Sequence, residues 1–331
     1  MIRAGVRRAL DRLERSRAAL PLANALLGLL RATPLRRGLV VMQHRVAAGR
    51  GDDTQEFTPA MSRADLSAQL ALLARHCCTV PASDIQASAA SRRRGEPFPV
   101  AITFDDDTVS HIDDALPVLA EHGVSATFFL NGIALGEPRQ YWWELLQAGR
   151  DDGAGWEDLV PAGTLDEARE LGGGSLTPWD VSGAVQQMAP PDRAALTAEL
   201  TARYGETAPT GLGRQAIGAL LDAGHAVGWH GHRHEPMALL APEALARELD
   251  DGRVDLEAVV GAPLTLIAYP HGWGDPAAAQ AVRERGFTAG FTTESRAVRA
   301  GDDALLLGRV DGWPASLGAF ALRLVEALLR R

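Results

Sequence analysis

The sequence predicts an α/β protein that folds as one (β/α) barrel of about seven or eight strands with a long insertion. From Gly38 onward, short apolar runs alternate with segments of helical periodicity, which is typical of a parallel sheet covered by helices. With 331 residues, of which 46% are hydrophobic, the chain is long enough to bury a large core as a single domain. In such barrels, the chemistry lies at the carboxyl ends of the strands.

The expected elements follow one another along the chain from residue 38 to residue 331. The expected strands are 39–44, 98–104, 125–132, 225–230, 264–270, 287–292 and 304–310. The expected helices are 63–76, 112–123, 242–261, 276–286 and 316–331.

The segment 136–211 interrupts this alternation. It is rich in glycine and polar residues, it shows no strand pattern, and only 190–205 has helical periodicity. A connection of this length in a compact domain is usually a functional lid or an inserted subdomain. The aromatic run 141–143 either anchors this insertion in the core or lines a groove.

Residues 1–37 are predicted to form a basic amphipathic helix. The uncharged stretch 18–30 is too short to span a bilayer, and arginines follow it where a signal peptide would have small residues. The helix either packs on the barrel or makes a peripheral contact with a membrane surface. Cys77 and Cys78 are adjacent, so no disulfide framework is expected and a reducing compartment is permitted. We expect a cytoplasmic protein, with membrane association as the second reading.

The net charge of −9 argues against a nucleic-acid partner, because such proteins need a clustered basic surface. No glycine-rich phosphate loop is apparent, and the sequence carries no signal for an oligomeric state. The working class is therefore an enzyme that acts on a small or polymeric substrate without an organic cofactor.

Three consecutive carboxylates, Asp105, Asp106 and Asp107, follow the apolar run 98–104. Successive side chains at a strand end point to opposite sides, so Asp105 and Asp106 can serve different partners a few ångströms apart. Three interpretations compete: a solvated helix start, a nucleotide-sugar transferase that holds a divalent metal, and a hydrolase metal site.

The run "HAVGWHGHRH" ends another predicted strand and carries His230, His232 and His234. His230 and His234 are four residues apart, which allows both to bind one metal ion if the chain turns there. An accidental surface cluster is the alternative. Two histidines with one carboxylate leave a position open for water, as in catalytic zinc sites.

The order of "TFDD", "HxxxH" and "YPHG" resembles the polysaccharide deacetylases of carbohydrate esterase family 4. The resemblance covers nearly the whole chain after the first helix and implies a deformed (β/α) barrel. It implies that Asp105 is the general base and that Asp106, His230 and His234 are the metal ligands. It also implies a divalent transition metal, with zinc as the first candidate, and an acetylated saccharide substrate.

Departures from the family pattern affect several positions. Asp107 stands where the family has glycine, and Gly231 replaces a serine or threonine. The arginine that normally orients the catalytic aspartate is replaced by Ala268. Arg309 is the candidate substitute, and an ordinary surface arginine is the alternative.

The histidine of the family's carboxyl-terminal Leu-x-His motif is also missing, because His271 is the last histidine of the chain. The run "VVMQHRV" resembles the opening of the exopolysaccharide and biofilm-type deacetylases, in which the motif order is circularly permuted. This resemblance implies that His44 is the catalytic acid. A histidine with a purely structural role at the barrel end is the alternative.

Four further residues are predicted to contact the substrate: Tyr269, Trp313, Asp107 and Arg309. Aromatic faces suit sugar rings, and both aromatic residues fall at expected strand ends. The backbone N–H of Tyr269 is also a candidate for stabilising the oxyanion. The roles of His111, His232 and His271 stay open.

The sequence thus predicts a metal-dependent hydrolase that removes acetyl groups, first of all N-acetyl groups, from a saccharide. Two other classes are kept: a glycan-binding pseudoenzyme on the same barrel and, with less support, a metal-dependent glycosyltransferase. The altered motif positions are the only support for the pseudoenzyme, and the glycosyltransferase leaves the histidine pair unexplained.

Overall fold

The computed structural model describes residues 16–135, 140–174, 176–205, 211–313 and 316–330. Residues 1–15 of the predicted amino-terminal helix therefore lie outside the described residues. The same holds for both ends of the predicted insertion, at 136–139 and 206–210.

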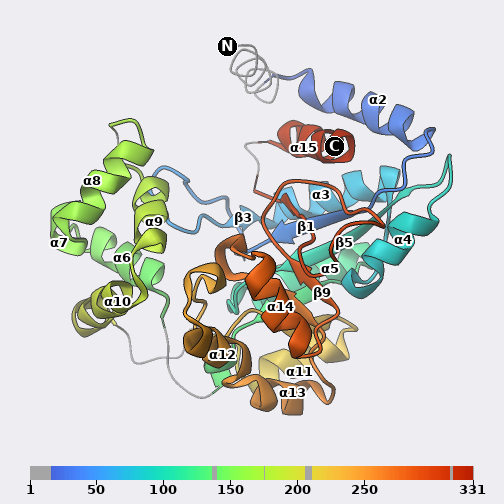
Figure 1. The fold of residues 1–331 in the computed structure, drawn as a ribbon. Coiled ribbons are helices and arrows are strands. Elements are labelled where there is room, and N and C mark those ends of the chain that lie inside the picture. The colour runs from blue at the N-terminus through green and yellow to red at the C-terminus, as the bar shows by residue number, and fades with distance from the viewer. Residues whose placement is uncertain (1–15, 136–139, 175, 206–210, 314–315, 331) are drawn as a thin grey trace.

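A curled parallel sheet forms the centre of the molecule (Figure 1). Its strands follow the order β10-β1-β5-β6-β7-β8-β9, and β4 pairs with β5 off this path. The bounds are β1 Leu39–Gln43, β4 Cys77–Thr79, β5 Phe98–Phe104, β6 Thr127–Leu130, β7 Ala226–Trp229, β8 Leu266–Ala268, β9 Ala289–Phe291 and β10 Val310–Asp311. Adjacent strands pair in parallel. The predicted deformed (β/α) barrel is confirmed.

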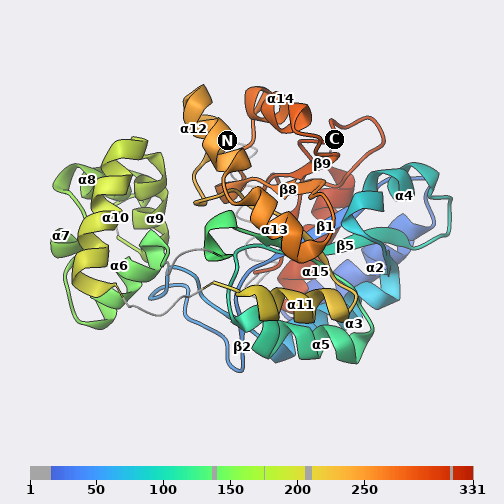
Figure 2. The ribbon, with the colours of Figure 1, turned by 90° about the horizontal axis from the view of Figure 1, so that it is seen from below.

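Helices cover the outside of this sheet (Figures 1 and 2). The longer ones are α3 Arg63–His76, α4 Ile85–Ser91, α5 Leu116–His122, α11 Arg214–Asp222, α12 Pro242–Asp250, α13 Arg253–Val260, α14 Pro276–Glu284 and α15 Leu317–Leu329. Single helical turns connect some elements: η1 Ala82–Asp84, η2 His111–Ala115, η3 Gly132–Leu135, η4 Met237–Leu239 and η5 Pro270–Gly272.

The central strand β5 explains why the apolar run 98–104 ends in charge. All seven of its residues are buried, because the strand pairs on both sides and its two faces are covered. Its carboxyl end lies beside β1, whose Gln43 carbonyl accepts a hydrogen bond from the Asp105 N–H at 2.9 Å. The three carboxylates therefore leave the sheet at the end where barrel chemistry is expected.

Six of the seven predicted strands form where they were expected, whereas the strand predicted over 304–310 begins only at Val310, in β10, after one isolated bridge at Leu307. Two further parts of the sequence prediction were incomplete. The helix predicted over 242–261 is broken into α12 and α13 at Gly252, whose φ of 72° does not fit a right-handed helix. Cys77 and Cys78 begin β4, and a small separate sheet pairs β2, Val46–Ala47, with β3, Met61–Ser62. None of these short strands has a pattern long enough to predict.

Five helices between β6 and α11 form a lobe beside the barrel (Figures 1 and 2). They are α6 Trp142–Asp151, α7 Trp156–Leu159, α8 Ala162–Leu171, α9 Pro178–Gln187 and α10 Pro190–Tyr204. The lobe has an apolar core of its own, built around residues such as Leu145, Leu165 and Val185. We refer to residues 140–205 as the helical lobe.

The helix α2, Ala19–Arg31, packs along α15 at the surface (Figure 1). Its inner face is formed by Ala19, Ala23 and Leu27, which are fully buried, and Gly318 of α15 allows the close approach. The described part of the helix thus packs on the barrel, which is the first of the two alternatives predicted for it. Leu29 on the outer face is exposed to solvent. A peripheral contact of this face with a membrane surface stays a prediction. Among the described residues, no helix has the length and apolar character needed to span a membrane.

Candidate metal centre and active site

The carboxylates after β5 are almost completely buried, with exposed fractions of 2% for Asp105, 6% for Asp106 and 3% for Asp107. Asp106 has a φ of 64°, in the left-handed region that non-glycine residues rarely adopt. This local turn lets three consecutive carboxylates point to three different sets of partners. An ionised carboxylate at this depth requires a positive charge or several hydrogen-bond donors.

Asp106 meets His230 and His234, which follow β7. The Asp106 Oδ1 atom lies 3.5 Å from the His230 Nε2 and 3.2 Å from the His234 Nε2, and the ligand atoms of the three residues are within 4.8 Å of one another. A tetrahedral zinc ion with bonds of about 2.1 Å would separate its ligands by about 3.4 Å. One carboxylate with two imidazoles is also a donor set that suits zinc and similar ions. The three residues therefore fit a divalent transition metal.

The histidines are held in place by the residues around them. The His230 Nδ1 lies 2.8 Å from the Ala268 carbonyl, which fixes the proton on that nitrogen and leaves Nε2 free for a metal. The loop after β7 is held by the buried Glu248, whose carboxylate accepts hydrogen bonds from the N–H groups of Arg233 and Glu235.

The same carboxylate explains why Gly231 replaces the family's serine or threonine. A Cβ at Gly231 would lie 2.4 Å from Glu248 Oε1, and the glycine φ is 82°. Any side chain at this position would therefore displace Glu248 and strain the backbone.

Asp105 binds Arg309 through both of its oxygens. The Arg309 Nη1 donates to Oδ1 and Nη2 donates to Oδ2, each at 2.6 Å, and the Arg309 Nε donates to the Thr292 carbonyl. Arg309 is fully buried, so it is not a surface arginine. The substrate contact predicted for Arg309 gains no support from this burial and stays a prediction. An arginine that replaces the one missing at position 268 would need to orient Asp105. The two parallel hydrogen bonds from Arg309 provide this orientation.

Burial and neighbouring charges act in opposite directions on the two ionised aspartates. Burial alone would raise the pKa of Asp105, but the Arg309 guanidinium, with His230 and His44, holds it below its usual range. Burial likewise opposes ionisation of Asp106, and hydrogen bonds and charge from His230 and His234 lower its pKa well below the usual range. Both carboxylates are therefore ionised at neutral pH.

Asp107 connects the barrel to the helical lobe. Its carboxylate accepts a hydrogen bond from the Tyr141 hydroxyl, which also lies 2.5 Å from the Asn131 Oδ1. Asp107 is thus buried next to Tyr141, at the start of the lobe, and the substrate contact predicted for it stays a prediction. A second link joins the buried Arg193 of α10 to Glu235, the neighbour of His234. The lobe therefore contacts both loops that carry the candidate metal ligands.

His44 follows β1 and is half-buried. Its charge lowers the pKa of both Asp105 and Asp106, after the larger effects of burial and of their bonded partners. His44 follows Gln43, whose carbonyl accepts the hydrogen bond from the Asp105 N–H, so His44 lies beside the carboxylates at the same edge of the sheet. The catalytic role predicted for it stays a proposal.

The two predicted aromatic contacts are in different environments. The Tyr269 ring is fully buried, the loop at Gly274 covers it, and its hydroxyl donates to the Leu305 carbonyl at 2.9 Å. Its N–H donates to the Phe291 carbonyl in the sheet. The burial of the ring and the pairing of the N–H therefore give no support to the substrate and oxyanion contacts predicted for Tyr269, and both stay predictions. Trp313 is half-buried and lines a pocket of about 520 Å³ that His44 also lines.

The remaining histidines are placed by the structure as follows. His111 is fully buried beside Phe104 and Phe128, and burial lowers its pKa to about 4, so it is neutral and cannot contact a substrate at the surface. His271 lies with its ring centroid 4.5 Å from that of His234. The backbone N–H of His232 donates a hydrogen bond to the backbone carbonyl of Glu248.

Left-handed backbone conformations mark the same site. Among the described residues, the non-glycine residues with positive φ are Asp106, His234 and His271, at 64°, 61° and 56°. All three belong to the loops that surround the candidate metal position. Such conformations cost free energy and are usually found where function requires them.

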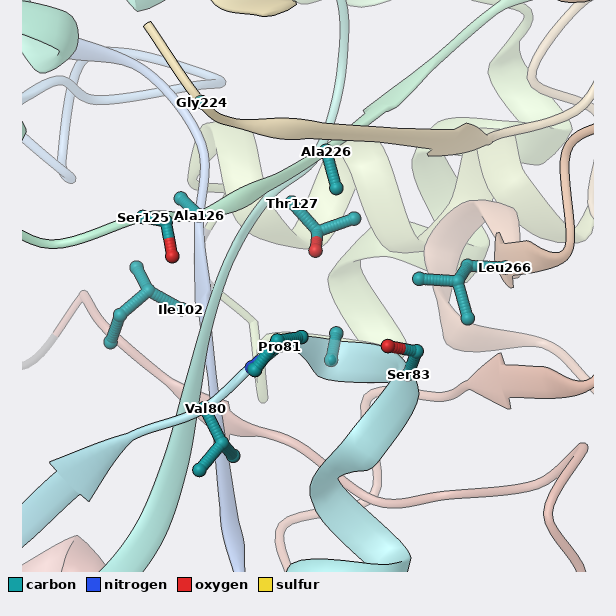
Figure 3. Close-up of a pocket in the computed structure, with 11 residues that line it drawn as sticks. Val80, Pro81, Ser83, Ile102, Ser125, Ala126, Thr127, Gly224, Ala226 and Leu266 are labelled. Carbon is teal, nitrogen blue, oxygen red and sulfur yellow. The ribbon is translucent and has the colours of Figure 1, made fainter. Parts of the chain in front are cut away.

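A smaller cavity of about 110 Å³ lies at the opposite end of the sheet (Figure 3). Thr127, Ala226 and Leu266 are the first residues of their strands and line it. Its eleven lining residues carry no charged group. The ionisable groups needed for hydrolysis are instead gathered at the carboxyl ends of the strands.

The family model for polysaccharide deacetylases matches residues 92–157 and 194–290. The chain therefore belongs to the polysaccharide deacetylase family. The matched segments contain the candidate metal ligands Asp106, His230 and His234 and also the neighbouring Asp105, whereas His44 and Arg309 lie outside them. Membership of this family supports a hydrolytic enzyme that deacetylates a polysaccharide. Among curated protein sequences, none matches this chain.

Solved structures share the fold at low sequence identity. The deacetylase PplD of Streptococcus pyogenes, in complex with acetate, has a TM-score of 0.57 and 14% identity over 89% of this chain and 99% of that one. IcaB from Ammonifex degensii has a TM-score of 0.54 and 20% identity over 86% and 97%. A de-N-acetylase from Aggregatibacter actinomycetemcomitans has a TM-score of 0.51 and 14% identity over 83% and 95%.

We predict that the protein binds one equivalent of zinc or a similar divalent ion through Asp106, His230 and His234. His230→Ala and His234→Ala should lose the metal, because each removes one of three protein ligands. Metal content after mild purification measures this directly. Zinc should also raise the midpoint of thermal unfolding of chelator-treated wild type but not of the variants, since only a bound ion stabilises the folded state.

His122→Ala is the matched control, because this histidine contacts Ser67 on the outside of the barrel. It should retain the metal. Full retention of metal by both His230→Ala and His234→Ala would overturn the ligand assignment.

We predict that Arg309→Met shifts the acidic limb of the activity profile to higher pH. Without the guanidinium, burial is opposed less strongly and the pKa of Asp105 rises, so the carboxylate becomes protonated at a higher pH. Turnover at neutral pH should fall by roughly two orders of magnitude, the scale of general base catalysis. The profile of kcat/KM against pH measures the shift.

Arg309→Lys should show a smaller shift, because it keeps the charge but loses the bidentate geometry. Arg283→Met, which removes an exposed arginine paired with Asp303, is the control and should leave the profile unchanged. An unchanged acidic limb in Arg309→Met would show that this pair does not set the protonation of the base.

Proposed function

We propose that the protein is a metal-dependent hydrolase that removes acetyl groups, first of all N-acetyl groups, from a saccharide. The observation that carries this proposal is the juxtaposition of two aspartates with separate partners. Asp106 faces two imidazoles, and its neighbour Asp105 is held ionised by Arg309. One carboxylate is thus available for a metal ion and the other for a proton. The structurally similar enzyme from Aggregatibacter actinomycetemcomitans is a de-N-acetylase, which supports the choice of an N-acetyl group.

Asp106, His230 and His234 would hold the metal ion. When bound, such an ion lowers the pKa of water towards neutrality and polarises a carbonyl oxygen. Asp105 accepts the proton of the attacking water as a new bond forms between the water oxygen and the acetyl carbon. Arg309 keeps Asp105 oriented and ionised, so that the proton transfer can begin at neutral pH.

The carbon–nitrogen bond then breaks, and the nitrogen requires a proton to leave as an amine. His44 is the proposed donor, because it follows Gln43, whose carbonyl accepts the hydrogen bond from the Asp105 N–H, and because it lines the adjacent pocket. The products are acetate and a free amino sugar. The proton taken up by Asp105 returns to solvent before the next turnover.

The contact between Arg309 and Asp105 weakens one argument for the pseudoenzyme. The missing arginine at Ala268 was part of its support, and Arg309 supplies a guanidinium to the same carboxylate from another strand. A nucleotide-sugar transferase gains no support from the family match. Acetate release from N-acetylated saccharides by the zinc-loaded protein tests the proposal, and a metal-loaded protein that releases none would favour the pseudoenzyme.

Asp105→Asn is predicted to keep the metal and to lose hydrolysis. An amide cannot accept the proton of water, whereas the Asp106 and histidine ligands are unchanged. Acetate release and metal content are measured on the same preparation. Asp113→Asn, an exposed position on η2, is the control and should behave as wild type. Turnover close to wild type in Asp105→Asn would exclude Asp105 as the base.

His44→Ala is predicted to lower turnover by about two to four orders of magnitude, the usual range for general acid–base catalysis, without loss of metal. The defect should be much smaller with an activated aryl acetate, because its leaving group departs without protonation. His76→Ala, whose ring contacts Asn24 on the outside of the barrel, is the control. Equal defects on both kinds of substrate would argue that His44 is not the acid.

A further inference from the structure

A pocket of about 520 Å³ lies beside His44, between the barrel and the helical lobe. Its volume is in the range of sites that bind small molecules or sugar units. The barrel contributes Trp313 after β10, and the lobe contributes Trp179 of α9. In both overall views, α9 lies on the side of the lobe that faces the barrel (Figures 1 and 2).

Trp179 is the most exposed large hydrophobic side chain among the described residues, with an exposed fraction of 79%. It stands on the first turn of α9, where Thr177 and Asp180 form a capping box. The opposite face of the helix, including Val181 and Val185, is buried in the lobe core. The indole is therefore presented to solvent from an ordered helix at the edge of the pocket, where a ligand can reach it.

Trp313 forms part of the barrel wall of the same pocket. The Arg50 guanidinium lies 4.2 Å from the centroid of the Trp313 ring. The backbone N–H of Trp313 donates a hydrogen bond to the Asp311 carboxylate. A cation over one face of an indole restricts the motion of the ring. The pocket is thus lined by two tryptophans from segments far apart in the sequence.

Charged side chains provide polar groups around the indoles. Arg45 lies 3.7 Å from Glu56, and Arg323 lies 3.3 Å from Asp311, and all four residues line the pocket. Sugar rings have an apolar C–H face, which packs on aromatic rings, and hydroxyl groups at their edges, which bond to carboxylates and guanidinium groups. Aromatic walls with a few charged groups therefore match a saccharide.

The position of His44 decides which part of the substrate enters this pocket. In the proposed reaction His44 gives its proton to the nitrogen that stays on the sugar, so the sugar must lie on the His44 side of the scissile bond. Since His44 lines the pocket, units joined to the acetylated sugar would extend into it rather than the acetyl group.

We propose that this pocket is a saccharide-binding subsite in which Trp179 and Trp313 stack on units next to the acetylated sugar. The proposal rests on the proposed function and deepens it, because it assigns the binding of the neighbouring sugar units to two named residues, one of which comes from the helical lobe. The lobe contributes Trp179, and the other residues that line the pocket belong to the barrel and to the segments between its strands. Hydrogen bonds fix the position of the lobe against the barrel: Tyr141 with Asp107, Arg193 with Glu235, and the Phe57 N–H with the Gln147 amide oxygen at 3.1 Å.

The test compares acetate release from N-acetylhexosamine as a single sugar and as oligomers of increasing length. Wild type should prefer the oligomers, and Trp179→Ala should lower kcat/KM on oligomers by about tenfold, mainly through KM, as expected for an aromatic anchor. The loss on oligomers should exceed the loss on the single sugar. Trp179→Phe should restore most of the preference, because it keeps an aromatic face.

Leu171→Ala, which changes an exposed residue of the same lobe outside the pocket, is the control and should leave the preference unchanged. Equal effects of Trp179→Ala on all chain lengths, or no effect on any, would overturn the subsite. A wild-type protein that releases no acetate would refute the proposed function. In that case, the existence of the subsite is tested by measuring the binding of oligomers. Oligomer titrations of Asp105→Asn, with and without Trp179→Ala, should show about tenfold weaker binding without the indole, and equal or undetectable binding would overturn it.

Discussion

The burial of three adjacent carboxylates at the end of β5 is the constraint on which this site depends. A carboxylate removed from water is costly unless donors or positive charge replace its hydration. Asp105 meets Arg309, Asp106 meets two imidazoles, and Asp107 meets the phenol of Tyr141. These partners come from three different parts of the chain, so the carboxylates are stabilised only when the barrel and the lobe are both folded.

Much of the barrel was predictable, because its strands are buried runs separated by helical patterns. The metal-ligand candidates were also visible, since the two aspartates are adjacent and the histidines are four residues apart. Arg309 was nominated only because the expected arginine was missing. Its contact with Asp105 arises from the strand order, in which β10 and β5 lie on either side of β1. Such proximity is a tertiary property that no local pattern contains.

The sequence signal failed where single residues act through long-range contacts or where elements are short. Glu248, which orders the histidine loop, had no distinguishing neighbours. Tyr141 stood out only as part of the aromatic run 141–143, which does not indicate that its hydroxyl binds Asp107. The position of Tyr269 at a strand end was predicted correctly, but the direction of its ring depends on the loop at Gly274. The helices of the lobe before residue 190 are short and lie among glycines, which hides their periodicity.

The left-handed backbone at Asp106 and His234 restricts how this site can change in evolution. Asparagine, aspartate, histidine and glycine tolerate such φ values better than other residues, whereas β-branched and longer side chains do not. A ligand set based on cysteine or glutamate would therefore need a different loop conformation as well as new side chains. The backbone thus favours oxygen and imidazole donors, so that new specificities are more accessible through the walls of the substrate pocket than through exchange of the ion for a thiophilic one.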